Sequence, residues 1–253
     1  MQVGATLGRP QDRKIPTAKE RNDKMGFNEK VHAFIAAKFY DYLTKEFNEQ
    51  GRKAFIHATQ YYAETRGRRM AQRAIRDGCD LDYVTYSQYG EWVPTSEIKE
   101  DENHIIELKS LSPDLVMHVL RCPWHIQFKE MGMTEAGHEY CQHLDNSISR
   151  GFNPYISFNV DTTLHKSDKC LFRVLDVNLD EEPMRAKKTE YLQSFEYHCA
   201  HSYWAYNEVT GAIFGEKGEE VNACVLKDFV QAYGQEMADK LVSYKHTNFN
   251  VAN

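Results

Sequence analysis

The stretch IIELKSLSPDLVMHVLRCP, residues 105–123, contains two short apolar runs separated by a turn signal. The runs cover residues 105–108 and 115–120, and Ser112-Pro113-Asp114 lies between them. Such a pattern predicts an antiparallel β-hairpin. Proline is favoured at the first position of a helix, so Pro123 predicts that the second strand leads directly into a helix with Cys122 as its N-cap.

Two further strands are predicted downstream, over residues 156–160 and 171–177, joined by a polar loop at residues 165–168. Helical patterns lie on both sides of this strand region. We therefore expect an α+β fold in which a small antiparallel sheet packs with N-terminal and C-terminal helices, rather than a series of repeated βαβ units.

Apolar residues at helical spacing define the flanking helices. They predict one helix from Asn28, its candidate N-cap, to Gly51, and a second from Lys53 to Asp77. After the strands, the helical spacing returns in residues 192–213 and again in residues 221–237. Residues 1–25 are charged, contain glycine and proline and show no periodicity, which predicts a flexible arm before a single α+β domain of residues 26–253.

Charge and apolar content restrict the classes of function. With 31 Lys and Arg against 37 Asp and Glu, the net charge is −6, which favours neither nucleic acid nor an anionic membrane as a partner. No run approaches the ~18 apolar residues of a membrane span, and the N-terminus lacks the apolar stretch of a signal peptide. We expect a cytoplasmic protein that binds a small-molecule substrate, and the sequence is compatible with a homodimer.

The six cysteines are spread singly along the chain, which predicts free thiols rather than disulfides. Cys122 is the first candidate for chemistry. At a helix N-cap its sulfur would lie beside unpaired amide donors and the positive end of the helix dipole, a setting that lowers a thiol pKa and favours a nucleophilic thiolate. The alternative is a small buried apolar cysteine at a structural corner.

A second group of candidates lies on a helix predicted from Thr134 to about Ser149. His138, Cys141 and Asp145 are spaced i, i+3 and i+7 on it, so their side chains share one face. They could form an acid–base relay or a nucleophile with its base, or belong to a simply polar helix. Cysteines and histidines between residues 122 and 143 also suit zinc, but no recognised ligand spacing is present, so we predict no metal or other cofactor.

Three other features have both a chemical and a structural interpretation. Arg150, at a helix exit, could hold a substrate carboxylate bidentately or form a surface salt bridge. His201 could carry protons or be a hydrogen-bonded structural group. The basic segment from Arg66 to Arg76 is interpreted as a solvated helix face, with a partner surface as the alternative.

An ordered series of segments resembles the L-2-amino-thiazoline-4-carboxylic acid hydrolase family over roughly residues 27–238. The series comprises Arg121-Cys122-Pro123, Tyr140-Cys141 with Asp145, Arg150-Gly151-Phe152-Asn153-Pro154, Thr162-Thr163-Leu164, Ser167–Phe172, His201 with Tyr203, and Phe214–Gly218. One departure is Lys169, which stands before Cys170 where the family leads us to expect a second cysteine or an acidic residue.

The resemblance implies hydrolytic opening of a thiazoline ring, a cyclic amidine that bears a carboxylate, to give a carbamoyl-cysteine. The reaction needs an attacking group, a proton carrier and a cationic clamp. The corresponding candidates are Cys122 or Cys141 as nucleophile, His138 or His201 as proton carrier, Asp145 as the residue that orients it, Arg150 as clamp, and Asn153 and Tyr203 as further substrate-binding residues. The alternative function is a non-catalytic small-molecule-binding or sensor domain of the same fold.

Overall fold

The computed structural model describes residues 26–180 and 187–252, so the predicted arm of residues 1–25 lies outside the described residues. Within these ranges the chain forms seven α-helices and one four-stranded sheet, and the predicted α+β class is confirmed. The helices are α2 (Glu29–Arg76), α3 (Tyr83–Gln88), α4 (Pro123–Glu130), α5 (Thr134–Phe152), α6 (Phe195–Phe214), α7 (Glu216–Tyr233) and α8 (Gln235–Ser243). Three 3₁₀ turns, η1 (Glu100–Glu102), η2 (Thr189–Tyr191) and η3 (Tyr244–His246), complete the helical elements.

The two predicted N-terminal helices are the two arms of the kinked helix α2. Its N-cap is Asn28, as predicted, and the Asn28 side chain accepts a hydrogen bond from the Val31 N–H at 3.1 Å. The predicted break between two helices is present, but it is a kink at Asn48 (φ 53°, ψ −126°), three residues before the predicted end at Gly51. The kink needs a residue that tolerates a left-handed backbone, and asparagine does so more readily than most.

The strands are β1 (Ile105–Ser110), β2 (Leu115–Arg121), β3 (Phe158–Thr162) and β4 (Cys170–Val174). They form an antiparallel sheet in the order β1-β2-β4-β3, which confirms the predicted hairpin and the second strand pair, with bounds shifted by a few residues. Apolar residues on one face are buried, Leu115 and Val174 completely. This face is therefore packed against the helices.

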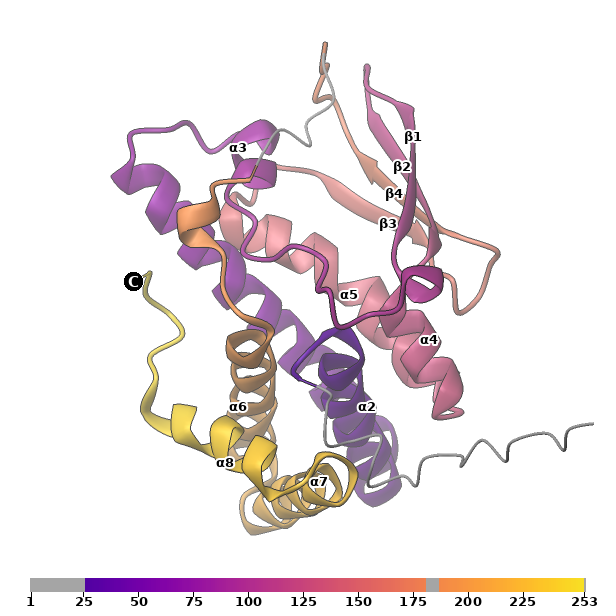
Figure 1. The fold of residues 1–253 in the computed structure, drawn as a ribbon, viewed down its shortest axis with the longest axis vertical. Helices are drawn as coiled ribbons and strands as arrows, with labels where there is room; N and C mark the ends of the chain where they lie inside the picture. The colour runs from indigo at the N-terminus through magenta and orange to yellow at the C-terminus, as the bar shows by residue number, and fades with distance from the viewer. Residues whose placement is uncertain (1–25, 181–186, 253) are drawn as a thin grey trace, which may run out of the picture.

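Helix α5 lies between the sheet and α2, and helices α6, α7 and α8 lie on the other side of α2 (Figure 1). The crossing of α2 and α5 is close because each helix has a glycine there. A Cβ atom on Gly67 would overlap the Ile148 carbonyl oxygen, and one on Gly151 would overlap the Glu64 carbonyl oxygen. This close approach brings the side chains of the two helices towards one shared space beneath the sheet.

A second apolar layer holds α2 against the C-terminal helices. The Tyr206 ring stacks on Phe39 and Phe55, with ring centroids 5.0 and 5.3 Å apart. Helix α6 ends at Phe214, next to the predicted end at residue 213, but the predicted last helix is divided into α7 and α8 at Gly234, which has a φ of 87°. Aromatic rings thus form much of the packing between α2 and the C-terminal helices.

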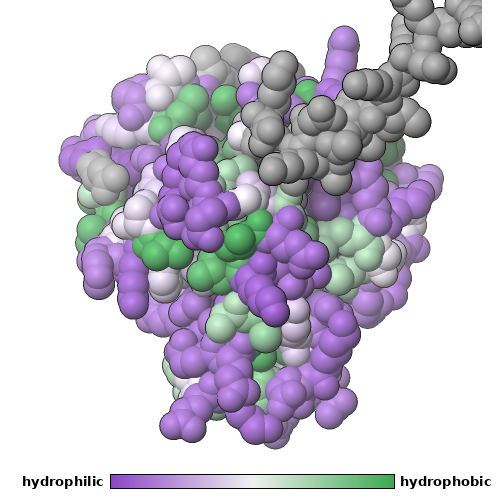
Figure 2. Space-filling view, turned by 60° about the horizontal axis from the view of Figure 1, so that its bottom comes forward, coloured by the Kyte–Doolittle hydropathy of each residue, from purple (hydrophilic) through white to green (hydrophobic). Residues whose placement is uncertain are grey.

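Hydrophilic residues dominate the face seen in Figure 2, with hydrophobic residues in small patches among them. None of the helices in the described part of the chain combines the length and apolarity that crossing a bilayer requires.

Candidate active site

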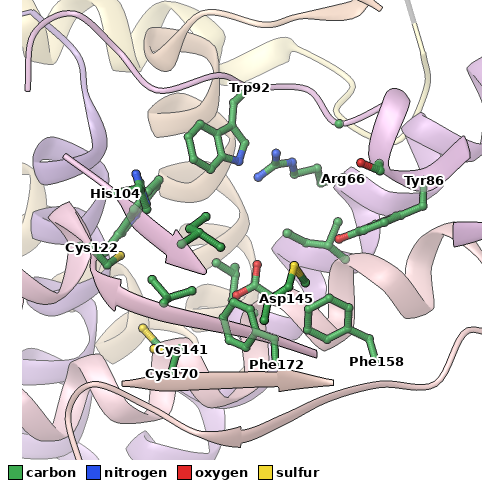
Figure 3. Close-up of a pocket in the computed structure, with 18 of the residues that line it drawn as sticks. Arg66, Tyr86, Trp92, His104, Cys122, Cys141, Asp145, Phe158, Cys170 and Phe172 are labelled. Atoms are coloured by element: carbon green, nitrogen blue, oxygen red, sulfur yellow. The ribbon is translucent and has the colours of Figure 1, made fainter. Parts of the chain in front are cut away.

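A cavity of about 320 Å³ lies between the sheet and the helices (Figure 3). All four strands contribute to its wall, together with α2, α3, α5, α6 and the N-terminal end of α4. Its lining is mostly apolar and aromatic, with a small number of polar groups directed inwards, which is the usual character of a small-molecule site.

The strand-to-helix corner forms as predicted, with Cys122 at the N-cap of α4 and Pro123 in the first turn. Cys122 lines the cavity. However, burial raises the pKa of its thiol to about 12, and the backbone hydrogen bonds from His125 and Trp124, which lower the pKa, only partly offset this effect. The expectation of a low thiol pKa at this N-cap is therefore wrong, because desolvation outweighs the helix terminus.

Two more thiols, from α5 and β4, line the cavity together with Cys122. Burial raises the pKa of Cys141 well above its ordinary value and that of Cys170 to about 11. The Cys141 Sγ lies 3.7 Å from the His165 Nε2, and the Cys170 Sγ accepts a hydrogen bond from the Leu164 N–H at 3.2 Å. All three thiols are consequently protonated near neutral pH.

Iodoacetamide should therefore alkylate Cys122 and Cys141 slowly in the folded protein. Only the thiolate reacts, and a thiol whose pKa rises from 9.0 to about 12 carries roughly a thousandfold less thiolate at pH 8. We expect labelling of both cysteines to be at least about a hundredfold slower than in urea, measured by mass spectrometry of the tryptic peptides. Equal rates in the folded and unfolded protein would contradict the raised pKa values.

Asp145 is a carboxyl group inside the cavity, one helical turn beyond Cys141 on α5. Within the described residues, no hydrogen bond or ion pair reaches its carboxylate. Burial raises its pKa from 3.8 to about 6, and the charge of Arg66 only partly opposes this shift. The group is thus mostly ionised at pH 7 and able to accept a proton, which are the properties of a general base.

Arg66, rather than the predicted Arg150, is the arginine positioned to bind a carboxylate in the cavity. It lies on α2, lines the cavity and is only 6% exposed. Its Nε is 3.7 Å from Glu91 Oε2 and has no hydrogen-bond partner among the described residues. Figure 3 shows Arg66 beside Trp92, across the cavity from Phe158 and Phe172, with Asp145 between the two sides.

Arg66 belongs to a buried cluster of three arginines around one carboxylate. Arg69 donates two hydrogen bonds to Glu91, at 3.1 and 2.7 Å, and Arg73 donates one at 2.6 Å. Three guanidinium groups around a single carboxylate leave an excess of positive charge at this end of the cavity. The interpretation of the segment from Arg66 to Arg76 as a solvated face is thus wrong for Arg66, Arg69 and Arg73, which are buried.

A further cation, Lys187, lines the same cavity. Its Nζ donates a hydrogen bond to the Ser87 carbonyl oxygen at 3.0 Å, and burial lowers its pKa to about 8. The ring of His198 also contributes to the wall. Because the His198 Nε2 must donate to the Glu91 carbonyl oxygen, at 3.1 Å, its Nδ1 is an acceptor, which has no partner in the described part of the chain.

Both predicted proton carriers and the predicted carboxylate clamp lie outside the cavity wall. His138 faces Thr163, whose hydroxyl oxygen lies 3.0 Å from the His138 Nδ1, and it makes no contact with Asp145 that would orient it. His201 Nδ1 lies 3.4 Å from both terminal nitrogens of Arg69, which places it in the arginine cluster. Arg150 donates two hydrogen bonds to Glu64, at 2.9 and 2.7 Å, so the plainer salt-bridge interpretation describes it.

The two further predicted substrate-binding residues also have structural partners. The Asn153 side chain donates a hydrogen bond to the Leu81 carbonyl oxygen at 2.7 Å, and Tyr203 is buried in the core beside Phe39. Of the predicted set, the cavity therefore collects Cys122, Cys141 and Asp145. Within the described residues, no group of three or more metal-binding side chains could hold an ion.

Residues 28–174, more than half of the chain, match the model of the protein family described as L-2-amino-thiazoline-4-carboxylic acid hydrolase. The matched part runs from the N-cap of α2 to the end of β4 and contains most of the cavity wall, including Arg66, Cys122 and Asp145. No curated protein and no solved structure matches the chain.

Proposed function

The chain belongs to the L-2-amino-thiazoline-4-carboxylic acid hydrolase family, and on that premise we propose that it opens a small cyclic amidine that bears a carboxylate. The proposal depends on one observation above all. A carboxyl that no described residue reaches with a hydrogen bond, Asp145, shares a cavity with a buried guanidinium, Arg66, whose Nε makes no hydrogen bond among the same residues. Unsatisfied buried polar groups are costly, and a ligand with matching groups removes the cost.

The substrate class fits these two groups. Its carboxylate would bind Arg66, which can donate two parallel hydrogen bonds, and the surplus positive charge of the arginine cluster would strengthen this binding. The nitrogens of its amidine would face Asp145, an acceptor. The substrate would thus be held by its two ends, with the amidine carbon next to the carboxylate that must act on it.

The chemistry that follows is the addition of water to the amidine carbon. Asp145 accepts a proton from the water as the new oxygen–carbon bond forms, and the carbon–nitrogen double bond yields its electron pair to nitrogen. Asp145 gives this proton to that nitrogen and takes up the proton of the new hydroxyl group, so that the carbonyl forms as the bond to the ring sulfur or to the ring nitrogen breaks. The protonated Asp145 returns its proton to the departing atom, so that the net change is the addition of one water molecule to give a carbamoyl-cysteine.

Activated water is favoured over a thiolate as the attacking group. The cavity thiols have raised pKa values, and burial lowers the pKa of His165, whose imidazole contacts Cys141, to about 3. Proton transfer from a weakly acidic thiol to a weakly basic imidazole is unfavourable in the free protein. Asp145, with a pKa near 6, is the better base.

Incubation of the purified chain with L-2-amino-thiazoline-4-carboxylate in ¹⁸O-water tests the proposal. We expect a product heavier by one labelled water, with the label in the carbamoyl group. A thiol reagent distinguishes cleavage of the carbon–sulfur bond, which releases a free thiol, from cleavage of a carbon–nitrogen bond. Tight binding without product would instead favour a non-catalytic binding domain of the same fold.

A further inference from the structure

The cavity has two chemically different sides. The groups that carry charge, Arg66, Lys187 and Asp145, come from helices α2 and α5 and from the segment before η2. The opposite side is the sheet, and every strand contributes apolar side chains to it: Ile106, Leu108, Met117, Val119, Phe158 and Phe172. A ligand that fills this space therefore meets these charged groups on the helix side, among apolar helix residues such as Leu144 and Ile148, whereas the sheet offers it apolar contact.

The apolar side continues to the solvent at the edge of the sheet. Ile106 and Leu108 line the cavity and are nevertheless 50% and 37% exposed. Both belong to β1, which in the described part of the chain is an edge strand paired with β2 alone. An apolar group on a ligand could therefore follow β1 from the interior of the cavity towards its mouth.

The size of the cavity supports the same conclusion. An apolar cavity of about 150 Å³ accommodates one benzene molecule, and the present cavity measures about 320 Å³. A thiazoline ring with one amino group and one carboxylate is only modestly larger than benzene, and it is polar on most of its edges. It would occupy the helix side and leave the apolar sheet side without a partner.

We propose that the ligand of this cavity is an amphipathic carboxylate, in which an apolar substituent on the cyclic amidine packs against the sheet and β1. The inference relies on the proposed function for the amidine and for the reaction at it. The apolar substituent and the carboxylate are inferred from the cavity wall itself. Burial of the substituent would supply affinity, whereas the charged groups would fix its orientation.

Calorimetric titration of the full chain with butyrate, hexanoate and octanoate tests the apolar side without any turnover. The affinity should rise roughly fourfold for each methylene that enters the cavity. Hexanamide, which has no charge for Arg66, should bind at least about tenfold more weakly than hexanoate. Equal affinities across the three acids would overturn the inference.

A pair of matched variants locates the effect. Leu108→Asn places an amide at the cavity mouth, and Leu120→Asn makes the same change on β2 at a residue of similar exposure, 38%, that does not line the cavity. Leu108→Asn should weaken octanoate binding by at least about tenfold and remove most of the dependence on chain length. Leu120→Asn should change neither, and an equal loss in both variants would count against a ligand path along β1.

Comparing the rates of ring opening for two substrates tests this inference separately from the proposed function. Bare L-2-amino-thiazoline-4-carboxylate is compared with the same ring carrying a benzyl group on its sulfur-bound methylene carbon. We expect kcat/KM to be at least about tenfold higher for the substituted ring. A preference for the bare ring would refute the apolar substituent while leaving the hydrolase intact. Failure to open either ring, with chain-length dependence preserved, would refute the hydrolase alone.

Discussion

Replacing Asp145 with asparagine should lower kcat/KM for ring opening by about 10²–10⁴-fold, because the water would lose the base that accepts its proton. Asparagine has nearly the same shape as aspartate and preserves the hydrogen-bond acceptor, but its amide cannot take up a proton at neutral pH. The rate is measured with L-2-amino-thiazoline-4-carboxylate or with the substituted ring. An Asp145→Asn variant with undiminished kcat/KM would exclude Asp145 as the base.

The pH dependence gives an independent measure of the same role. The base must be ionised, and the pKa of Asp145 in the free protein is raised to about 6 by burial. The value of kcat/KM in the wild type should thus fall below about pH 6 as the carboxylate is protonated. Asp145→Asn should retain its low residual rate without this acidic limb.

The stability of the Asp145→Asn variant shows whether a lower rate comes from loss of the fold or from loss of the base. The folded-state pKa of Asp145 lies above the ordinary value of 3.8, so the folded protein binds this proton more tightly than the unfolded chain. The contribution of this group to stability therefore falls between about pH 3.8 and pH 6 and its full cost applies above pH 6, so the asparagine variant should be at least as stable as the wild type at pH 7. Asp168→Asn, at an exposed side chain outside the cavity, is the control and should change neither rate nor stability.

The local elements could be predicted because their signals are local. The hairpin over residues 105–121 and the Cys122–Pro123 helix start depend on a turn, two apolar runs and one proline, all within a few residues of one another. The break between the two arms of α2 is predicted at Gly51, whereas the kink itself lies at Asn48. One residue in a left-handed conformation leaves little trace in the pattern of apolar residues.

The cavity could be predicted only in part, because burial and pairing are tertiary properties. Arg66, Arg69 and Arg73 are spaced i, i+3 and i+7, which places them on one helix face but does not say whether that face is wet or buried. The partner that decides the question, Glu91, lies on a loop 18 residues beyond Arg73. Likewise, the position of Cys122 was predictable from the sequence, but the high pKa of its thiol depends on the walls that enclose it.

The largest effect on stability is expected from replacing Glu91, the carboxylate at the centre of the arginine cluster. Glu91 is completely buried, and Glu91→Gln would leave Arg66, Arg69 and Arg73 around a neutral amide. Breaking a buried charge pair by removing one partner typically costs about 3–5 kcal/mol, because the remaining charge cannot be solvated. We expect a loss of this size in the free energy of unfolding at pH 7, measured by urea denaturation.

The control is another glutamate that binds an arginine through two hydrogen bonds, but at the surface. Glu64 pairs with Arg150, whose side chain is 44% exposed, so Glu64→Gln should cost less than about 1 kcal/mol. If Glu91→Gln proved as mild as Glu64→Gln, the arginine cluster would not depend on its central carboxylate.

The effect of Glu91→Gln should also depend on pH in a direction that follows from the pKa of Glu91. Burial alone would raise this pKa, but the Arg69 guanidinium and its neighbours outweigh burial and hold it at about 2, below the ordinary 4.5. A carboxyl with a lowered folded-state pKa contributes stability above its unfolded pKa and loses it as the pH falls towards the folded value. The difference in unfolding free energy between the wild type and Glu91→Gln should therefore be full above about pH 4.5 and shrink towards pH 2. A difference that stayed constant over this range would mean that the glutamine variant is destabilised by altered packing rather than by three guanidinium groups without a counter-charge.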